Sequence, residues 1–403
     1  TNIQIDVPAP SGLLVGASDE ATEASDPAGP GAPGTNLTIG NGANPPPTTS
    51  VNGGSVTINT ADGSFSYNPP PGFTGPDSFN YVVCDDGIGN PGPLCSAPIT
   101  VTLNVSGTRI WFVDNNVSGG ANDGRLSSPF ESLTAFNVLQ GGGGAASPAA
   151  GDFIFLASSA TEYSDGANGI SLLDDQTLFG QGAQGITFDA LTGITAATHS
   201  VHRPVLGGSN PIISSSNDSV RVNTSVASAN TIRGLTIGNS TAGYALNGNV
   251  AGSLTTLDLD LQGNGGAISL NGLGTGILNV AINSLAMSNS TQSPAFRVQN
   301  MSAGMLMTSS TSIAAPAGDG FDFNNNAGTQ FVLNGFGNLL TTAGTGISAN
   351  SGGMITLSAG APPTIQTIGG PALDLTNTVT SGFNFGSLSA NTSVSGVILN
   401  DVC

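Results

Sequence analysis

Six short segments in the second half of the chain decide its fold: GAISL at 266–270, PAFRV at 294–298, GFDF at 320–323, GISA at 346–349, PALDL at 371–375 and GVILN at 396–400. Each places alternating apolar residues after a Gly or Pro. The aligned positions follow one another at intervals of 28, 25, 26 and 26 residues, and they are Ile268, Phe296, Phe321, Ile347 and Leu373. Self-similarity at a fixed period in this range predicts a solenoid.

A second apolar segment and a weaker third one follow in each repeat. Three short β-like segments per unit, separated by Gly and Asn turns, predict a parallel β-helix rather than a helical repeat. We expect the five aligned residues to stack in one interior column, while Arg297 lies outward over Asp322 as a cross-coil ion pair. Residues 151–403 would then form about nine or ten coils, at ~4.8 Å per coil.

The composition excludes several classes of function. Of 403 residues, 59 are Gly, 24 are Pro and only 8% are charged, and the net charge is −19. There is no lysine, and the six arginines are scattered singly. Nucleic acid and anionic membrane surfaces would be repelled. No apolar run approaches the ~20 residues of a membrane helix. We therefore expect no nucleic-acid partner and no membrane insertion.

Residues 1–106 are Pro-rich with short alternating strands, which predicts a β-sandwich. The run GSFSYNPPPGFTGPDSFNYVVCDDG at 63–87 resembles the repeat of bacterial Ig-like, cadherin-like domains of large secreted adhesins. The matching residues are Phe65, Tyr67, Pro69, Gly72, Phe73, Gly75, Asp77, Ser78, Phe79, Tyr81, Asp85 and Gly87. The resemblance implies an extracellular or cell-surface location.

Three cysteines are present. Cys84 and Cys95 flank a turn-rich stretch, and we predict a local disulfide between them because the composition is that of an extracellular protein. Cys403 is then left without a disulfide partner. It could form an intermolecular disulfide, or its partner could lie in a longer native chain.

Residues 107–150 form an entry segment. Ser128-Pro129-Phe130-Glu131 reads as a capping box and predicts a helix start, with an apolar stripe of Phe130, Leu133, Phe136, Val138 and Leu139. This resembles the entry of secreted β-helix proteins, where an amphipathic helix plugs the open end of the coil. An ordinary surface helix is the alternative.

Several acids could ligate calcium, which is the only metal we consider. Asp77, Asp85 and Asp86 lie near one end of the Ig-like domain, where some relatives bind calcium, and Asp114 and Asp123 lie in a polar loop. Their spacing fits no defined calcium loop. Turn and capping roles are the alternative, and we assign no metal or cofactor.

The β-helix fold also hosts polysaccharide lyases and hydrolases, so an enzymatic function is an alternative for this chain. Glycoside hydrolysis needs two carboxylates about 5 to 9.5 Å apart. Asp322 and Asp374 share a column but skip a coil, which places them ~10 Å apart. His199 and His202 lie in a loop-like stretch far from those acids. We therefore assign no catalytic residue and predict a protein that is not an enzyme.

The sequence thus predicts an all-β chain: an Ig-like sandwich (1–106), an entry segment (107–150) and a right-handed, pectin-lyase-like parallel β-helix (151–403). It resembles autotransporter-like adhesins, which implies an extracellular structural protein, adhesin or filament subunit. The alternatives are a polysaccharide lyase or hydrolase and a carbohydrate-binding module. Expected partners are a surface polysaccharide or a second copy, joined end to end, through Cys403, or by donation of the strand that carries Ile3, Ile5 and Val7.

Overall fold

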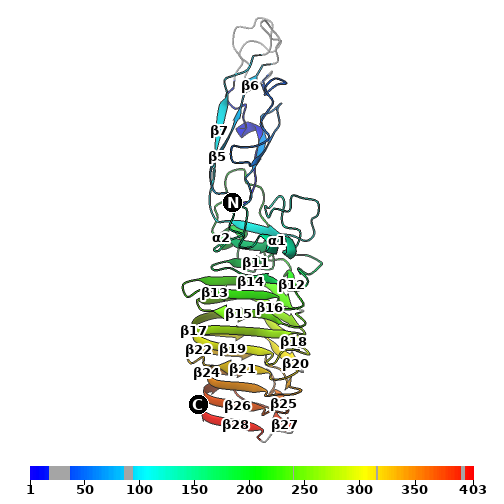
Figure 1. Ribbon diagram of the computed structural model, residues 1–403, viewed down its shortest axis with the longest axis vertical. Coiled ribbons are helices and arrows are strands. Elements are labelled where there is room, and N and C mark those ends of the chain that lie inside the picture. Colours follow the sequence, from blue (N-terminus) through cyan, green and yellow to red (C-terminus); the bar gives the residue numbers. More distant parts are fainter. Residues whose placement is uncertain (18–36, 86–93, 239, 315, 392–394) are drawn as a thin grey trace.

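The computed structural model describes residues 1–17, 37–85, 94–238, 240–314, 316–391 and 395–403. The molecule is elongated (Figure 1), with a small N-terminal domain above a regular stack of strands that ends at the C-terminus. The prediction of an all-β fold with an Ig-like domain and a parallel solenoid is confirmed.

The N-terminal domain consists of short antiparallel strands. β4 lies between β1 and β3, β5 pairs with β7, and β2 pairs with β6. A small core fills the space between them, made of Leu13, Ile39, Val56, Tyr67 and Phe79. The bounds are β1 (Ile5–Val7), a 3-10 turn (Ala9–Ser11), β2 (Thr38–Ile39), β3 (Ser55–Ile58), β4 (Phe65–Asn68), β5 (Gly75–Tyr81), β6 (Val83–Cys84) and β7 (Ile99–Val105).

A disulfide joins Cys84 and Cys95, as predicted. It ties β6 to the segment that leads into β7. A domain with so few buried apolar residues gains much from such a crosslink.

The solenoid strands pair in parallel, each with the strand one turn before and one turn after it. Several long strands bend and serve two faces in succession. The bounds are β8 (Ile110–Val113), β9 (Phe153–Leu156), β10 (Ile170–Ser171), β11 (Thr177–Gly180), β12 (Ile212–Ser214), β13 (Val220–Thr224), β14 (Ala229–Gly238), β15 (Tyr244–Val250), β16 (Ser253–Gly263), β17 (Gly266–Ile282), β18 (Ser284–Ser288), β19 (Phe296–Thr308), β20 (Thr311–Ala314), β21 (Phe321–Asn324), β22 (Thr329–Asn334), β23 (Leu339–Leu340), β24 (Ile347–Ser358), β25 (Thr364–Ile368), β26 (Leu373–Ser381), β27 (Ser387–Asn391) and β28 (Val397–Val402).

The stack has three faces. The first face contains β10, β13, β15, β21, β28 and the first parts of β17, β19, β24 and β26. The second face contains β8, β9, β11 and β22, the first parts of β14 and β16, and the second parts of β17, β19 and β24. The third face contains β12, β18, β20, β23, β25 and β27.

The interior of the first face is one continuous column of apolar side chains. In register from turn to turn it consists of Ile170, Val220, Leu246, Ile268, Phe296, Phe321, Ile347, Leu373 and Val397. All but Val397 are buried. The repeat spacing predicts this arrangement, because each turn can bury its inward residues only against its neighbours.

The helix of the entry segment, α1 (Leu133–Leu139), begins later than the capping box predicts. Its N-cap is Ser132, whose side chain accepts a hydrogen bond from the Ala135 amide. The predicted start at residues 128–131 is wrong because Phe130 is extended: its amide donates to the Phe112 carbonyl, and its carbonyl accepts from Asp114. Val138 is also not part of the apolar stripe and is 77% exposed.

The α1 helix covers the first turn of the solenoid core. Leu133 and Phe136 are fully buried, and Phe130 packs between Trp111 and Phe136. The inward side chains of this end are therefore removed from water.

A second aromatic cluster on the outer side of the first turns was not predicted. Phe112, Phe155 and Phe179 point outward from β8, β9 and β11 and are covered by Phe188 of the helix α2 (Phe188–Thr192) and by Ile3. The signal in the sequence is the continuous apolar runs IWFV and FIFL, because a strand that is buried on both faces does not alternate.

Candidate functional site

The outward side of the first face carries a polar residue at almost every turn. In register, one column consists of Ser171, Arg221, Asn247, Ser269, Arg297, Asp322, Ser348, Asp374 and Ile398. We call this the mixed polar column. Its members repeat at the ~4.8 Å spacing of hydrogen-bonded strands.

A second outward column lies two residues further along each strand. It is dominated by carboxamides and consists of Asn223, Asn249, Asn271, Gln299, Asn324, Asn350, Thr376 and Asn400. We call this the amide column. A carboxamide carries donors and an acceptor, and some of these groups are used within the protein: Asn324 donates to Asp322, and the Asn271 side-chain oxygen accepts from Leu273 and Asn300. Together the two columns form a ribbon of hydrogen-bonding groups along the rod.

Every arginine in the chain forms an ion pair with an aspartate. The pairs are Arg109–Asp152, Arg125–Asp123, Arg203–Asp189, Arg221–Asp218, Arg233–Asp258 and Arg297–Asp322. The Arg297 Nε to Asp322 Oδ2 distance is 3.4 Å and follows the predicted cross-coil pairing. With each guanidinium neutralised locally, the remaining surface charge is acidic.

Asp322 and Asp260 are the two described carboxyl groups whose pKa burial raises, and Asp322 lies on the mixed polar column. Burial raises its pKa, the Arg297 guanidinium opposes the rise, and the nearby carboxylate of Asp319 adds to it. Asp374 lies two turns away on the mixed polar column, with Ser348 between them. The separation is therefore ~10 Å, which is wide for a glycosidase pair.

The histidines lie away from these acids. His199 and His202 lie in the loop between α2 and β12, where the His199 carbonyl accepts a hydrogen bond from the Asp6 amide. Arg203 in the same loop is paired with Asp189. This loop therefore contacts the N-terminal domain and does not join the carboxylates of the first face.

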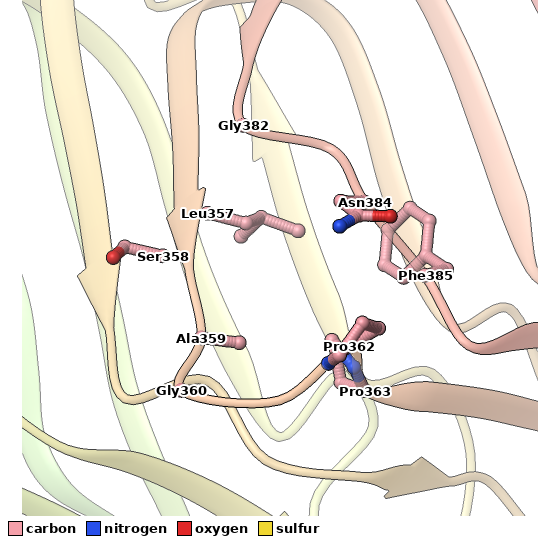
Figure 2. Close-up of a pocket in the computed structure, with 9 residues that line it drawn as sticks. All are labelled: Leu357, Ser358, Ala359, Gly360, Pro362, Pro363, Gly382, Asn384 and Phe385. Atoms are coloured by element: carbon pink, nitrogen blue, oxygen red, sulfur yellow. The ribbon is translucent and has the colours of Figure 1, made fainter.

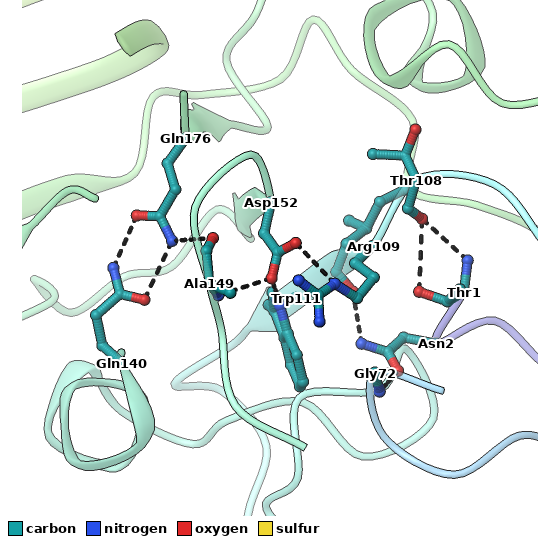
Figure 3. Close-up of polar contacts among 11 residues, drawn as sticks. Thr1, Asn2, Gly72, Thr108, Arg109, Trp111, Gln140, Ala149, Asp152 and Gln176 are labelled. Atoms are coloured by element: carbon teal, nitrogen blue, oxygen red, sulfur yellow. Dashed lines mark hydrogen bonds and ion pairs between the residues drawn. The ribbon is translucent and has the colours of Figure 1, made fainter. Parts of the chain in front are cut away.

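The junction between the two domains is held by a polar network (Figure 3). Asp152 accepts hydrogen bonds from Arg109 Nε at 2.9 Å, Trp111 Nε1 at 2.8 Å and the Ala149 amide at 2.8 Å. Asn2 donates to the Ile110 carbonyl and accepts from the Gly72 amide. The Gly72 φ angle is +68°, and a Cβ atom there would lie 2.0 Å from the Ala145 carbonyl oxygen, so only glycine fits.

Three surface pockets lie at distinct places along the molecule. One of about 320 Å³ lies between turns near the C-terminal end, where Leu357, Pro362, Asn384 and Phe385 surround it (Figure 2). Another of about 290 Å³ lies between the domains. A third, of about 450 Å³, lies beside α1 at the start of the mixed polar column.

The residues proposed for calcium do not come together. Asp77 is 3% exposed, and its carboxylate accepts hydrogen bonds from the Ser50 and Tyr67 hydroxyls and from the amides of Asn52 and Ser78. Asp114 accepts from Asn116, Asp123 is paired with Arg125, and the Asp85 carboxylate accepts from the Leu94 amide. Asp86 lies outside the described residues. No group of three metal-ligating side chains occurs in the described part of the chain.

The residues proposed for assembly lie in different environments. β1 with Ile5 and Val7 pairs with β4 of its own domain, and Ile3 packs against the outward aromatic cluster. The outer edge of β1 is bonded to the loop at Ser200. Cys403 is exposed and has a free thiol.

The outward side of the second face carries exposed apolar residues between polar ones such as Asn279 and Gln330. Ile277 is 41% exposed, Met305 41%, Met307 38% and Val379 47%. Met305 and Val379 belong to one column in register through Gln330 and Met354. Apolar side chains grouped on a flat sheet surface are typical of contact surfaces.

Comparison with known proteins identifies the N-terminal domain. A family model described as a bacterial Ig domain matches residues 13–104, which confirms the predicted resemblance. No curated protein matches the chain with significance. Among solved structures, the chain is similar to the Yersinia enterocolitica family 28 exopolygalacturonase, with 10% identity and a TM-score of 0.19 over 84% of this chain and 85% of that one. A TM-score this low carries no argument about activity.

None of the helices in the part of the chain that the structure describes is long and apolar enough to cross a membrane. The chain consists of an N-terminal bacterial Ig domain followed by a parallel β-solenoid of about ten turns.

Proposed function

We propose that this chain is a non-catalytic structural protein, secreted or on the bacterial cell surface, that acts as an adhesin or as a subunit of an extracellular filament. The observation that carries the proposal is the ribbon formed by the mixed polar and amide columns, which repeats hydrogen-bonding groups along the rod. A surface built by repetition suits contact with an extended partner such as a surface polysaccharide.

An extracellular location is supported by the disulfide between Cys84 and Cys95, since such bonds persist in oxidising compartments. The low content of charged residues and the bacterial Ig domain agree with this location.

Self-association is part of the proposal. The apolar outward strip of the second face, with Ile277, Met305, Met307 and Val379, supports lateral contact between copies. Strand donation has less support, because β1 is already paired with β4. End-to-end stacking through β28 and linkage through Cys403 are further routes.

The second candidate function is a polysaccharide lyase or hydrolase. It is favoured by the raised pKa of Asp322 beside Asp319, because a carboxyl group that retains its proton can act as a general acid. The paired state of all six arginines weakens it.

A turnover assay separates the two functions. The protein is incubated with neutral and acidic polysaccharides, with and without calcium, and both reducing ends and unsaturated products are measured. We expect no product above that of the Asp322→Asn variant. Product release by the unsubstituted protein that this variant abolishes would establish the enzymatic function instead.

Electron microscopy and sedimentation of concentrated protein test the self-association. Met305→Ser combined with Met307→Ser should reduce lateral association, whereas Val138→Ser, an exposed apolar residue on α1, serves as the matched control. Equal association of both variants would exclude the strip as the contact.

A further inference from the structure

The pocket of about 450 Å³ beside α1 is built differently from the rest of the surface. It lies between α1, the loop at 165–169 and the first strands of the first face. The polar side chains that line it are Asn137, Gln140, Asp165, Asn168, Ser171 and Arg221. Ser171 and Arg221 are also the first two members of the mixed polar column.

The lining side chains are fixed by hydrogen bonds among themselves. Asn137 Nδ2 donates to Asp165 Oδ2 at 3.0 Å and to the Gly169 carbonyl at 2.9 Å. Arg221 Nε donates to Asp218 Oδ2 at 3.0 Å, and its Nη2 donates to Asn168 Oδ1 at 3.1 Å. Side chains held in this way lose little conformational entropy when a ligand binds.

The same side chains retain groups without a partner among the described residues. These are the Asn137 side-chain oxygen, the Asn168 amide nitrogen, the Ser171 hydroxyl and the Arg221 Nη1, none of which forms a hydrogen bond with another described residue. The residues that line the pocket therefore carry two donor groups, one acceptor and one hydroxyl that can do both, all without a partner among the described residues. A ligand hydroxyl group, which both donates and accepts, matches this mixture.

The charge of the pocket opposes an acidic ligand. Arg221 is neutralised by Asp218, and Asp165 leaves the site negative in a chain with a net charge of −19. An acidic glycan would meet repulsion and no unpaired guanidinium. A neutral polyhydroxylated ligand meets neither problem.

The pocket opens onto a track of further polar groups. Beyond Arg221 the column continues with Asn247 and Ser269 on the next two turns. An extended ligand that leaves the pocket along the axis would find a hydrogen-bonding side chain about every 4.8 Å.

We propose that this pocket is the terminal binding site for a neutral polysaccharide, whose chain then runs along the mixed polar column over Asn247 and Ser269. The inference deepens the adhesin function proposed above and rests on it.

The test measures binding of neutral hexasaccharides of the cello, manno, malto and xylo series, with an oligogalacturonate of equal length as the acidic comparison. Calorimetry or an immobilised glycan array gives the affinity. We expect at least one neutral probe to bind and the acidic one to bind more weakly. Asn168→Ala and Arg221→Ala should each weaken binding about fivefold to tenfold, since each removes one or two hydrogen bonds.

Arg233→Ala is the matched control. Arg233 lies on β14, outside the pocket and outside the mixed polar column, and it is paired with Asp258 as Arg221 is with Asp218. It should leave binding at the pocket unchanged. Because Asn168 is exposed in a loop, the Asn168→Ala variant should fold as the unsubstituted protein does. The fluorescence of Trp111 can verify that the fold is retained.

Binding of no neutral probe, preference for the acidic one, or equal effects of Arg233→Ala and Arg221→Ala would each overturn the inference. Any of these results would leave the broader adhesin proposal standing if the protein still adhered to cells. Turnover in the assay above would remove the proposed function itself.

Discussion

The Ig domain and the solenoid stabilise themselves in different ways. The Ig domain has five buried apolar residues in its core cluster, and it adds a disulfide and a buried carboxylate, Asp77, that accepts five hydrogen bonds. The solenoid has a continuous apolar interior from Trp111 to Leu375 and needs no crosslink among its described residues. A small core depends on a few strong local constraints, whereas a stacked core depends on repetition.

The largest effect is expected from the solenoid column. Phe321→Ala removes a fully buried ring that packs against Phe296, Phe323 and Phe336. Unfolding in urea should show a loss of about 3–5 kcal/mol. Phe321→Leu, which keeps most of the volume, should lose less than about 1.5 kcal/mol. Equal losses would mean that column packing does not stabilise this region.

Removal of the disulfide should have the next largest effect, confined to the Ig domain. With a separation of 11 residues between Cys84 and Cys95, the Cys84→Ser and Cys95→Ser double variant should lose about 2–4 kcal/mol. Hydrogen exchange followed by mass spectrometry should show faster exchange in β4 and β5 and unchanged exchange in β19 and β21. Faster exchange in both domains would show that they unfold as one unit.

Acid should weaken the Ig domain before the solenoid. Burial alone would raise the pKa of Asp77, but hydrogen bonds from Ser50, Tyr67 and two amides outweigh it and hold the pKa below the ordinary value of 3.8. The stabilisation is therefore complete above that value and is lost as the pH falls through the lower folded-state pKa.

The solenoid should be less sensitive to acid, because the pKa shifts of its carboxyl groups have opposite signs. Burial raises the pKa of Asp260 and Asp322, whereas hydrogen bonds lower the pKa of Asp174 and Asp218. Hydrogen exchange, measured at increasing urea concentrations between pH 5 and pH 3, reports the free energy of unfolding of each domain. On acidification this free energy should fall more in the Ig domain than in the solenoid. Asp77→Asn should cost about 1–3 kcal/mol at neutral pH and should reduce the pH dependence. An unchanged pH dependence would exclude Asp77 as its source.

The smallest effect is expected at the ion pair of the first face. Both partners of the Arg297–Asp322 pair are partly exposed, so Arg297→Ala should change the free energy of unfolding by only a few tenths of a kcal/mol. A loss similar to that of Phe321→Ala would indicate that surface pairing contributes as much as the core column.

The difference between the regions also explains which predictions succeeded. In the solenoid, a fixed period sets the register, so the inward residues Ile268 to Leu373 and the outward pair Arg297–Asp322 could be read from spacing alone. In the entry segment the pattern Ser-x-x-Glu is a purely local signal. There, pairing of Phe130 with the β8 strand overrides it, and the helix begins at Leu133.

The sequence by itself determined the all-β class, the stacking register of the later turns, the disulfide and the surplus of negative charge. These follow from periodicity, composition and short-range spacing. Only the tertiary structure decided that Asp77 is buried in a network of donors, that each arginine meets an aspartate, and that α1, the loop at 165–169 and two strands enclose a polar pocket. Such groupings join residues that lie tens of positions apart without a common period, because it is the path of the chain in space that brings them together.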